Sequence, residues 1–236
     1  MSSNSPKTAY WTGFRDGAPF ILVVVPFALL FGVIATEAGL DLVEAMSMTV
    51  LVIAGAAQFT ALALMLDHAP TFIVLLTALA VNLRMAMYSA ALVPHLGRER
   101  LGIRALMAYF MVDQAFAVAY KKYEETPEMS LAEKSAYYFG CLSPIVPLWY
   151  AFSYVGAVMG KAIPPEYSLD FAIPICFIAL TAPMMRSLPH FIAALVSIVA
   201  ALLLAWVPYS LGLIIAALLA MVTGAQAELW LARRVR

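Results

Sequence analysis

The stretch "AVNLRMAMYSAAL", residues 80–92, places Asn82 and Arg84 near the centre of an otherwise uncharged run from Pro70 to Val93. A run of about 20 apolar residues is long enough to cross the hydrocarbon core of a membrane, which is about 30 Å thick. The whole chain agrees, because 64% of its residues are hydrophobic and only 12% are charged. Soluble domains carry about 25% charged residues. The composition therefore predicts an all-α, polytopic membrane protein.

The apolar segments are joined by short polar loops, none of them long enough to form a soluble domain. Residues 1–17 lack a cleavage pattern after a short apolar core, so we expect the first apolar run to stay in the membrane. We predict a cytoplasmic N-terminal segment over 1–17 and a single transmembrane transport domain over 18–236. The eight candidate segments are roughly residues 18–37, 44–66, 70–94, 103–121, 136–160, 167–186, 189–206 and 209–231.

A polar linker, residues 122–135, divides the chain into halves of similar length, about 18–121 and 136–231. Each half opens with a long apolar run and then passes a short loop that contains Leu-Asp. Each then enters a segment that Gly or Pro interrupts. Residue identity between the halves is slight, so an internal duplication is a hypothesis based on this shared outline.

The interrupted segments are 44–66, with Gly55 at mid-length, and 167–186, with Pro174 and Pro183. Interruptions at matching positions indicate a transport site, because a broken membrane helix exposes backbone groups that can bind a solute. The alternative is a kinked but continuous span, or a close helix crossing through small residues. The sequence leaves both open.

Two topologies, each with the N-terminus in the cytoplasm, fit the distribution of Lys and Arg almost equally well. Either all eight segments cross the membrane, or the two interrupted segments are re-entrant and six cross. The second topology makes the halves an inverted repeat of three crossings each, and we favour it. It places these six residues in the cytoplasm: Arg98, Arg100, Arg104, Arg233, Arg234 and Arg236.

A charge near the bilayer centre costs at least about 2.5 kcal/mol and usually faces a cavity or a partner. On a continuous helix, Arg84 shares a face with Tyr88, whereas Asn82 lies about 200° away around the helix. One unbroken helix cannot direct Asn82 and Arg84 to the same point. Either each side chain has its own partner, or the backbone unwinds here.

The next segment contains Asp113 near its midpoint, in "AYFMVDQAFAVAY". Arg84 and Asp113 therefore lie at comparable depth on consecutive segments, and a direct ion pair is feasible. The pair can be structural, locking two helices together. It can also be functional, with Arg84 orienting a substrate carboxylate or Asp113 carrying a proton. Gln58 and Asn82 add uncharged donors and acceptors in the same membrane zone.

The remaining polar residues do not form a catalytic or metal-binding motif. His68, His95 and His190 lie near segment ends without metal-ligand spacing, and the chain has no GxxxxGK[ST] phosphate loop. We interpret Cys141 and Cys176 as small buried hydrophobic residues. We therefore expect no cofactor, no metal, no nucleic-acid partner and no enzymatic activity.

Several stretches, taken together in this order, resemble the AzlC family, the large subunit of bacterial two-component branched-chain amino acid exporters. They are "PFALLFGVIATEAGL" (26–40), "AGAAQF" (54–59), "VNLRMAMYS" (81–89), "DQAFA" (113–117) and "SLDFAIPICFIAL" (168–180). The resemblance extends from about Gly13 to Arg234.

The resemblance implies export of valine, leucine, isoleucine and in some cases methionine across the bacterial inner membrane. It also implies a small membrane partner of the AzlD type. The polar motifs of the family fall on residues of this chain that we predict to bind substrate or couple transport: Gly55, Gln58, Asn82, Arg84, Tyr88 and Asp113.

Two residues depart from the family pattern. Met85 stands where the family often has His, and Gln114 stands where it often has Glu. Both changes remove titratable side chains, which bears on proton coupling and on substrate preference. A permease subunit of an ATP-driven system and a non-transporting membrane scaffold are the alternatives to a secondary exporter.

Overall fold

The computed structural model describes residues 5–160, 185, 187–207 and 211–234. Every regular element in these ranges is a helix, so the predicted all-α polytopic class is confirmed. The chain forms two compact units, residues 1–59 with 79–168 and residues 60–78 with 169–236. Four described stretches are long and apolar enough to cross a membrane: Pro6–Glu37, Thr71–Leu96, Leu131–Gly160 and Leu211–Leu231.

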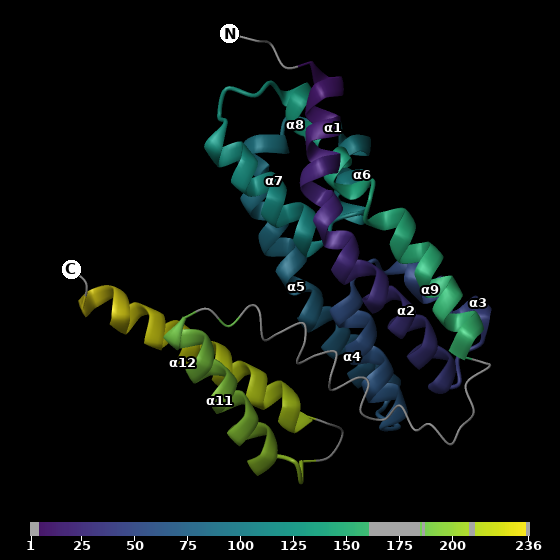
Figure 1. Ribbon diagram of the computed structural model, residues 1–236. Coiled ribbons are helices and arrows are strands. Elements are labelled where there is room, and N and C mark those ends of the chain that lie inside the picture. Colours follow the sequence, from purple (N-terminus) through teal and green to yellow (C-terminus); the bar gives the residue numbers. More distant parts are fainter. Residues whose placement is uncertain (1–4, 161–184, 186, 208–210, 235–236) are drawn as a thin grey trace. The chain divides into compact units, whose positions relative to one another are not determined.

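Figure 1 labels the helices. Those entirely in the first unit are α1 (Pro6–Gly17), η1 (Ala18–Phe20), α2 (Ile21–Glu37), α3 (Leu42–Leu51), α6 (Leu101–Tyr109), α7 (Asp113–Glu125), α8 (Leu131–Leu142) and α9 (Val146–Gly160). The first unit also includes residues 55–59 of α4 (Gly55–Leu66) and residues 79–96 of α5 (Thr71–Leu96). The second unit includes α11 (Leu188–Leu203) and α12 (Leu211–Arg234).

The first unit is built around two long spans, α1–α2 and α8–α9, that run parallel, with α1 against α8 and α2 against α9 (Figure 1). Glycines allow this close approach. A methyl group on Gly13 would meet the backbone of Tyr137, and one on Gly156 would meet the backbone of Leu29. Membrane helices associate mainly through such close packing, because lipid offers no hydrophobic driving force between them.

The α6–α7 segment is a re-entrant hairpin. Arg84 contacts Asp113 and His95 contacts Glu124, so α5 and α7 run in the same direction. Only four residues separate the end of α5 from the start of α6, so the α6–α7 segment begins and ends at the same end of α5. The prediction that 103–121 is a crossing segment is wrong: the helix breaks at residues 110–112 and the chain reverses.

This reversal also corrects the predicted relation between the halves. The first half crosses the membrane twice, through α1–α2 and α5, rather than three times. An even number of crossings returns the chain to its starting side, so α8–α9 enters in the same direction as α1–α2. The opening spans of the two halves are therefore parallel and not inverted.

The predicted interruption of segment 44–66 is confirmed, since α3 ends at Leu51 and α4 begins at Gly55. Gln58 Nε2 donates to Thr49 Oγ1 over 3.4 Å. Nine residues of a continuous helix would separate these positions by about 13.5 Å. The Thr49 and Gln58 side chains therefore meet across the break, which a continuous helix would not allow.

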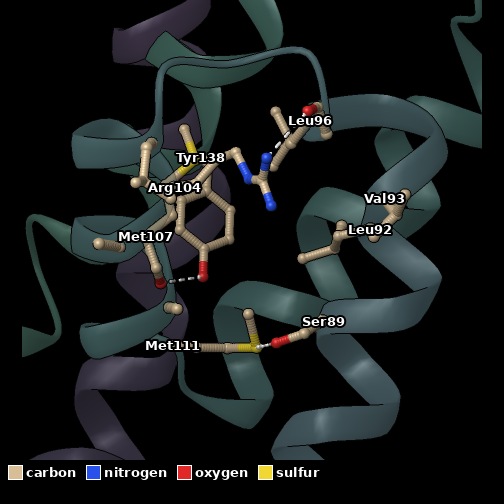
Figure 2. Close-up of a pocket in the computed structure, with 12 residues that line it drawn as sticks. Ser89, Leu92, Val93, Leu96, Arg104, Met107, Met111 and Tyr138 are labelled. Carbon is tan, nitrogen blue, oxygen red and sulfur yellow. Dashed lines mark hydrogen bonds between the residues drawn. The ribbon is translucent and has the colours of Figure 1, made fainter.

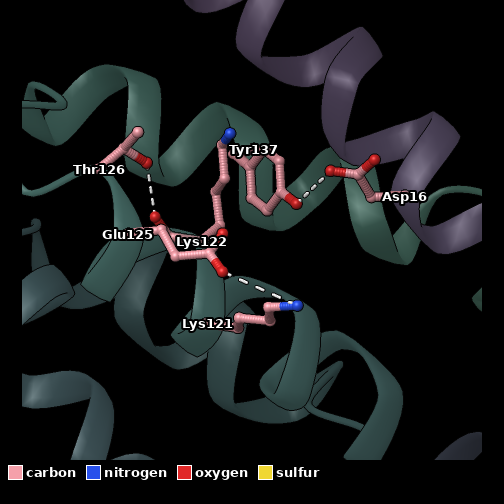
Figure 3. Close-up of polar contacts among 6 residues, drawn as sticks. All are labelled: Asp16, Lys121, Lys122, Glu125, Thr126 and Tyr137. Carbon is pink, nitrogen blue, oxygen red and sulfur yellow. Dashed lines mark hydrogen bonds and ion pairs between the residues drawn. The ribbon is translucent and has the colours of Figure 1, made fainter.

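The polar linker is shorter than the predicted 122–135, because α7 continues to Glu125 and α8 begins at Leu131. Thr126 Oγ1 donates to the Lys122 carbonyl at the end of α7, as Figure 3 shows. Ser130 and Glu133 form a capping box that starts α8. Tyr137 donates to Asp16 over 2.6 Å, which links α8 to α1 at the same end of the unit (Figure 3).

Basic residues gather at one end of the first unit. The opposite end, where α2 ends and α3 begins, carries Glu37, Asp41 and Glu44, with no Lys or Arg among its described residues. Because cytoplasmic loops carry the excess of Lys and Arg, the positive-inside rule predicts that the end with the N-terminus faces the cytoplasm. The basic residues there are Lys7, Arg98, Arg100, Lys121, Lys122 and Lys134.

In the second unit, α11 and α12 form an antiparallel hairpin, with Gly224 close to Ala193 and Gly212 close to Leu204. Their bounds confirm the predicted segments 189–206 and 209–231. The segment 167–186, with Pro174, Pro183 and Cys176, lies outside the described residues apart from Met185. Cys141 is fully buried, as predicted.

Candidate functional site

The centre of the site is an ion pair between Arg84 and Asp113. Arg84 Nη1 lies 3.0 Å from Asp113 Oδ2. Asp113 is the first residue of α7, directly after the extended Val112. The positive end of the helix dipole at this position stabilises a carboxylate. The ion pair judged feasible from the sequence is therefore formed, at the break of the α6–α7 hairpin.

Neither partner of the pair is fully satisfied. Arg84 Nε and Asp113 Oδ1 are both buried and have no hydrogen-bond partner. Burying a polar group without a partner costs free energy, so native proteins rarely leave such groups in place. Arg84 and Asp113 can therefore each form one more hydrogen bond. A pair that only holds two helices together does not need this capacity.

Tyr88 lies one turn from Arg84 on α5 and forms one wall beside the pair. Its ring stacks on Phe116, with centroids 4.1 Å apart and an interplanar angle of 11°. The Tyr88 hydroxyl is close enough to Asp113 and Arg84 to interact electrostatically with both. The stack keeps α5 and α7 in register beside the charges.

A second polar group lies at the α3–α4 break. Gln58 is fully buried, and while its amide nitrogen donates to Thr49, its Oε1 has no partner. Gly55, the first residue of α4, faces the ring of Trp149, and a methyl group there would lie 3.0 Å from the indole. Gly55 therefore has a packing role here. The Trp149 Nε1 is also buried without a partner.

The two broken hairpins meet. Tyr109, at the end of α6, donates its hydroxyl hydrogen to the carbonyl of Val50, near the end of α3, over 2.5 Å. Tyr150 of α9 lies 3.3 Å from the same hydroxyl. This contact satisfies one of the carbonyl groups that a helix end leaves without an intrahelical partner. We call the two helix breaks, residues 110–112 before Asp113 and residues 52–54 before Gln58, the tips of the hairpins. The hydrogen bond from Tyr109 to Val50 holds these tips together within the membrane zone.

Asn82 stands apart from the pair. Because α5 is one continuous helix over Thr71–Leu96, the backbone does not unwind between Asn82 and Arg84. Of the two side chains, Arg84 has its own partner, Asp113. The Asn82 Oδ1 is buried without a partner. On helical spacing it shares a face with Ser89 and not with Arg84.

Sequence reasoning did not identify the helix break at residues 110–112 or the roles of Tyr109 and Thr49. The break contains Phe110, Met111 and Val112, without Gly or Pro. The one local signal is Asp113 itself, an acidic residue of the kind that favours the first turn of a helix.

A family model described as AzlC protein matches residues 19–163. The chain is 29% identical over 128 residues to the Inner membrane protein YgaZ of Escherichia coli (strain K12), covering 52% of each protein, so it spans about half the length of YgaZ. It is 27% identical over 190 residues to an uncharacterized membrane protein of Archaeoglobus fulgidus, covering 79% of this chain and 80% of that protein. No solved structure matches.

The matched residues make up more than half of the chain and include α2, the α8–α9 span, both broken hairpins and all six predicted site residues. The relatives are named as membrane proteins, one of them of the inner membrane. The apolar spans agree with that location. This chain is a multi-pass inner-membrane protein that belongs to the AzlC family.

Proposed function

We propose that this chain exports hydrophobic amino acids, foremost valine, leucine and isoleucine, as a secondary transporter. One observation carries the proposal. Arg84 and Asp113 form a charge pair at the tip of a re-entrant hairpin, and each keeps a buried atom without a hydrogen-bond partner. Ionisable groups inside the membrane usually mark substrate or ion pathways. Membership of the AzlC family supports a membrane transporter.

The chemistry of the tips suits a zwitterion with an apolar side chain. Such a solute needs an anion site, a cation site and an apolar pocket. Arg84 offers donors to a carboxylate, and Asp113 offers an acceptor to an ammonium group. The N-termini of α4 and α7 add backbone N–H groups, as broken helices do in other transporters. Gln58 contributes one further buried acceptor.

A small membrane subunit of the AzlD type is part of the proposal, and the family resemblance supports it. We propose coupling to an ion gradient, with Asp113 as the group that gains and loses a proton. The chain is then a carrier and not an enzyme. The same polar groups favour transport over a scaffold role, because a scaffold gains nothing from buried polar atoms without partners.

The test is a flux assay in proteoliposomes that contain the chain alone or with its small partner. We expect efflux of leucine, driven by a pH gradient and unaffected by ATP. A requirement for ATP would favour the permease subunit of an ATP-driven system. Absence of leucine, valine and isoleucine flux with the partner present, from correctly folded protein, would contradict the proposal.

A further inference from the structure

A pocket lies between the cytoplasmic half of α5 and α6, separate from the ion pair. Its volume is about 280 Å³, close to the lower limit of roughly 300 Å³ for small-molecule sites. The wall is mostly apolar, with Leu92 and Leu96 from α5 and Ala108 from α6. Figure 2 shows these two helices facing each other across the space, with the Tyr138 hydroxyl bonded to the Met107 carbonyl on the α6 side.

The polar groups of the pocket lie at its two ends. At the cytoplasmic end, Arg104 is exposed, and its guanidinium donates to the Gly97 carbonyl over a long 3.5 Å. A guanidinium has five N–H donors, so most of them remain available to a carboxylate. At the inner end, Ser89 donates only to the Met111 sulfur, at 3.9 Å (Figure 2). A thioether is a weak acceptor.

Met111 is the floor of the pocket and lies in the hairpin break, two residues before Asp113. A methionine side chain is unbranched and adapts readily to different shapes. Asn82, with its buried and unpaired Oδ1, lies two turns beyond Ser89 on the same face of α5. The pocket therefore leads from the basic cytoplasmic end toward the break, with only a flexible side chain and a weak contact in between.

We propose that this α5–α6 pocket is the cytoplasmic entry subsite, which binds a neutral amino acid by its apolar side chain. Arg104 receives the carboxylate at the mouth, and Met111 moves aside to admit the solute to Arg84 and Asp113. The pocket rejects cationic amino acids, because Arg104 repels their positive side chains. It does not bind glycine well, because glycine has no apolar side chain to bury there. This inference rests on the proposed function, since it assigns an entry site to the same transport pathway.

The experiment measures protection of an engineered cysteine. Ala108→Cys is made in a chain in which Cys141 and Cys176 are replaced by Ala. A small, membrane-impermeant methanethiosulfonate is applied from the cytoplasmic side of reconstituted vesicles. Arg98→Cys, at the same end but outside the pocket lining, is the matched control. We expect saturating leucine to slow the labelling of Ala108→Cys about tenfold, as a filled apolar subsite should. Glycine and arginine should have no effect on this labelling. Leucine should not change the labelling of Arg98→Cys.

A second variant measures transport. Ala108→Trp fills the pocket, and we expect it to raise the KM for leucine about tenfold with little change in maximal flux, the scale of a lost hydrophobic subsite. Ala117→Trp, at an exposed alanine of α7 outside the pocket, is the control and should behave like the parent. Unprotected labelling of Ala108→Cys, or an unchanged KM in Ala108→Trp, would overturn the entry subsite while leaving the export function intact. No leucine flux in the parent chain would instead defeat the proposed function. In that case, protection of Ala108→Cys by leucine would still test whether the pocket binds it.

Discussion

At the residue scale, the central question is whether the Arg84–Asp113 pair only locks two elements or also acts on a solute. The geometry favours action, because Arg84 Nε and Asp113 Oδ1 are buried and each can take one further partner. Gln58 Oε1 and Asn82 Oδ1 share this property. Four of the six predicted site residues thus have unused hydrogen-bonding capacity. Gly55 packs against an indole ring, and Tyr88 stacks on Phe116 with its hydroxyl near the charge pair.

Asp113→Asn removes the charge and keeps the shape of the side chain. We expect leucine export to fall by roughly ten- to a hundredfold, because a hydrogen bond to a charged group contributes about 1.5–3 kcal/mol. The measurement is initial efflux at equal amounts of protein in the membrane. Full activity in this variant would remove Asp113 from the mechanism.

The double variant Arg84→Gln with Asp113→Asn separates the two roles. Removing one partner of a buried pair leaves an uncompensated charge, whereas removing both does not. We expect the double variant to recover thermal stability relative to Asp113→Asn and to remain inactive. If export returned together with stability, the pair would be structural. Gel-filtration profile and thermal unfolding in detergent are read beside the flux.

At the element scale, the first unit combines two parallel long spans with two broken hairpins whose tips meet. The parallel spans depend on small residues at the contact, and the tips depend on the hydrogen bond from Tyr109 to Val50. These are distinct kinds of contact. The first fixes the scaffold, and the second fixes the relative position of the two polar groups.

Tyr109→Phe should uncouple the tips without disturbing the scaffold. The lost hydrogen bond costs about 1 kcal/mol, so we expect a slightly lower unfolding temperature. We also expect a raised KM for leucine, because the groups at the two tips are no longer held at one spacing. Tyr154→Phe, at a half-exposed tyrosine of α9, is the control. An unchanged KM in Tyr109→Phe would show that the tips need no such link.

Gly156→Ala should destabilise the pair of opening spans. The added methyl group would meet the Leu29 backbone, and overpacking of this kind typically costs about 1–3 kcal/mol. Gly102→Ala in α6 is the matched control, because nothing lies within 4 Å of the added Cβ. There the higher helix propensity of Ala should slightly stabilise the protein. Equal effects of the two substitutions on thermal unfolding would argue against the glycine contact.

At the scale of the whole molecule, membrane orientation follows from the charge distribution over the ends of the first unit. The N-terminus, the α5–α6 loop and the α7–α8 loop share the basic end, and the α2–α3 loop lies at the acidic one. The even number of crossings before α8 sets this arrangement. The positive-inside rule then predicts that the α6–α7 hairpin, and the proposed entry subsite beside it, open toward the cytoplasm.

Cysteine labelling in intact cells tests the topology. With the native cysteines replaced, Asp41→Cys should react with an impermeant maleimide added outside, and Glu128→Cys should react only after the membrane is permeabilised. The positive-inside rule is the physical reason. Reaction of Glu128→Cys in intact cells would mean that 103–121 crosses the membrane after all.

Much of the fold and site could be predicted from residues alone. The apolar runs gave the membrane class, Gly55 indicated the α4 break, and charges at similar depth indicated the Arg84–Asp113 pair. The reversal at residues 110–112 could not be predicted, because Phe110 to Val112 carry no helix-breaking signal. The inverted repeat was wrong for the same reason, since it counted that hairpin as a crossing.

The sequence by itself determined that the chain is a helical membrane protein with ionisable groups inside the bilayer, because hydrophobicity and charge are local properties of residues. Only the tertiary structure decided which way each segment runs. The α6–α7 hairpin is fixed by the contacts of Asp113 with Arg84 and of Tyr109 with Val50, which join residues far apart in the chain. Such contacts have no signature in the local pattern, and they set the crossing number and the site together.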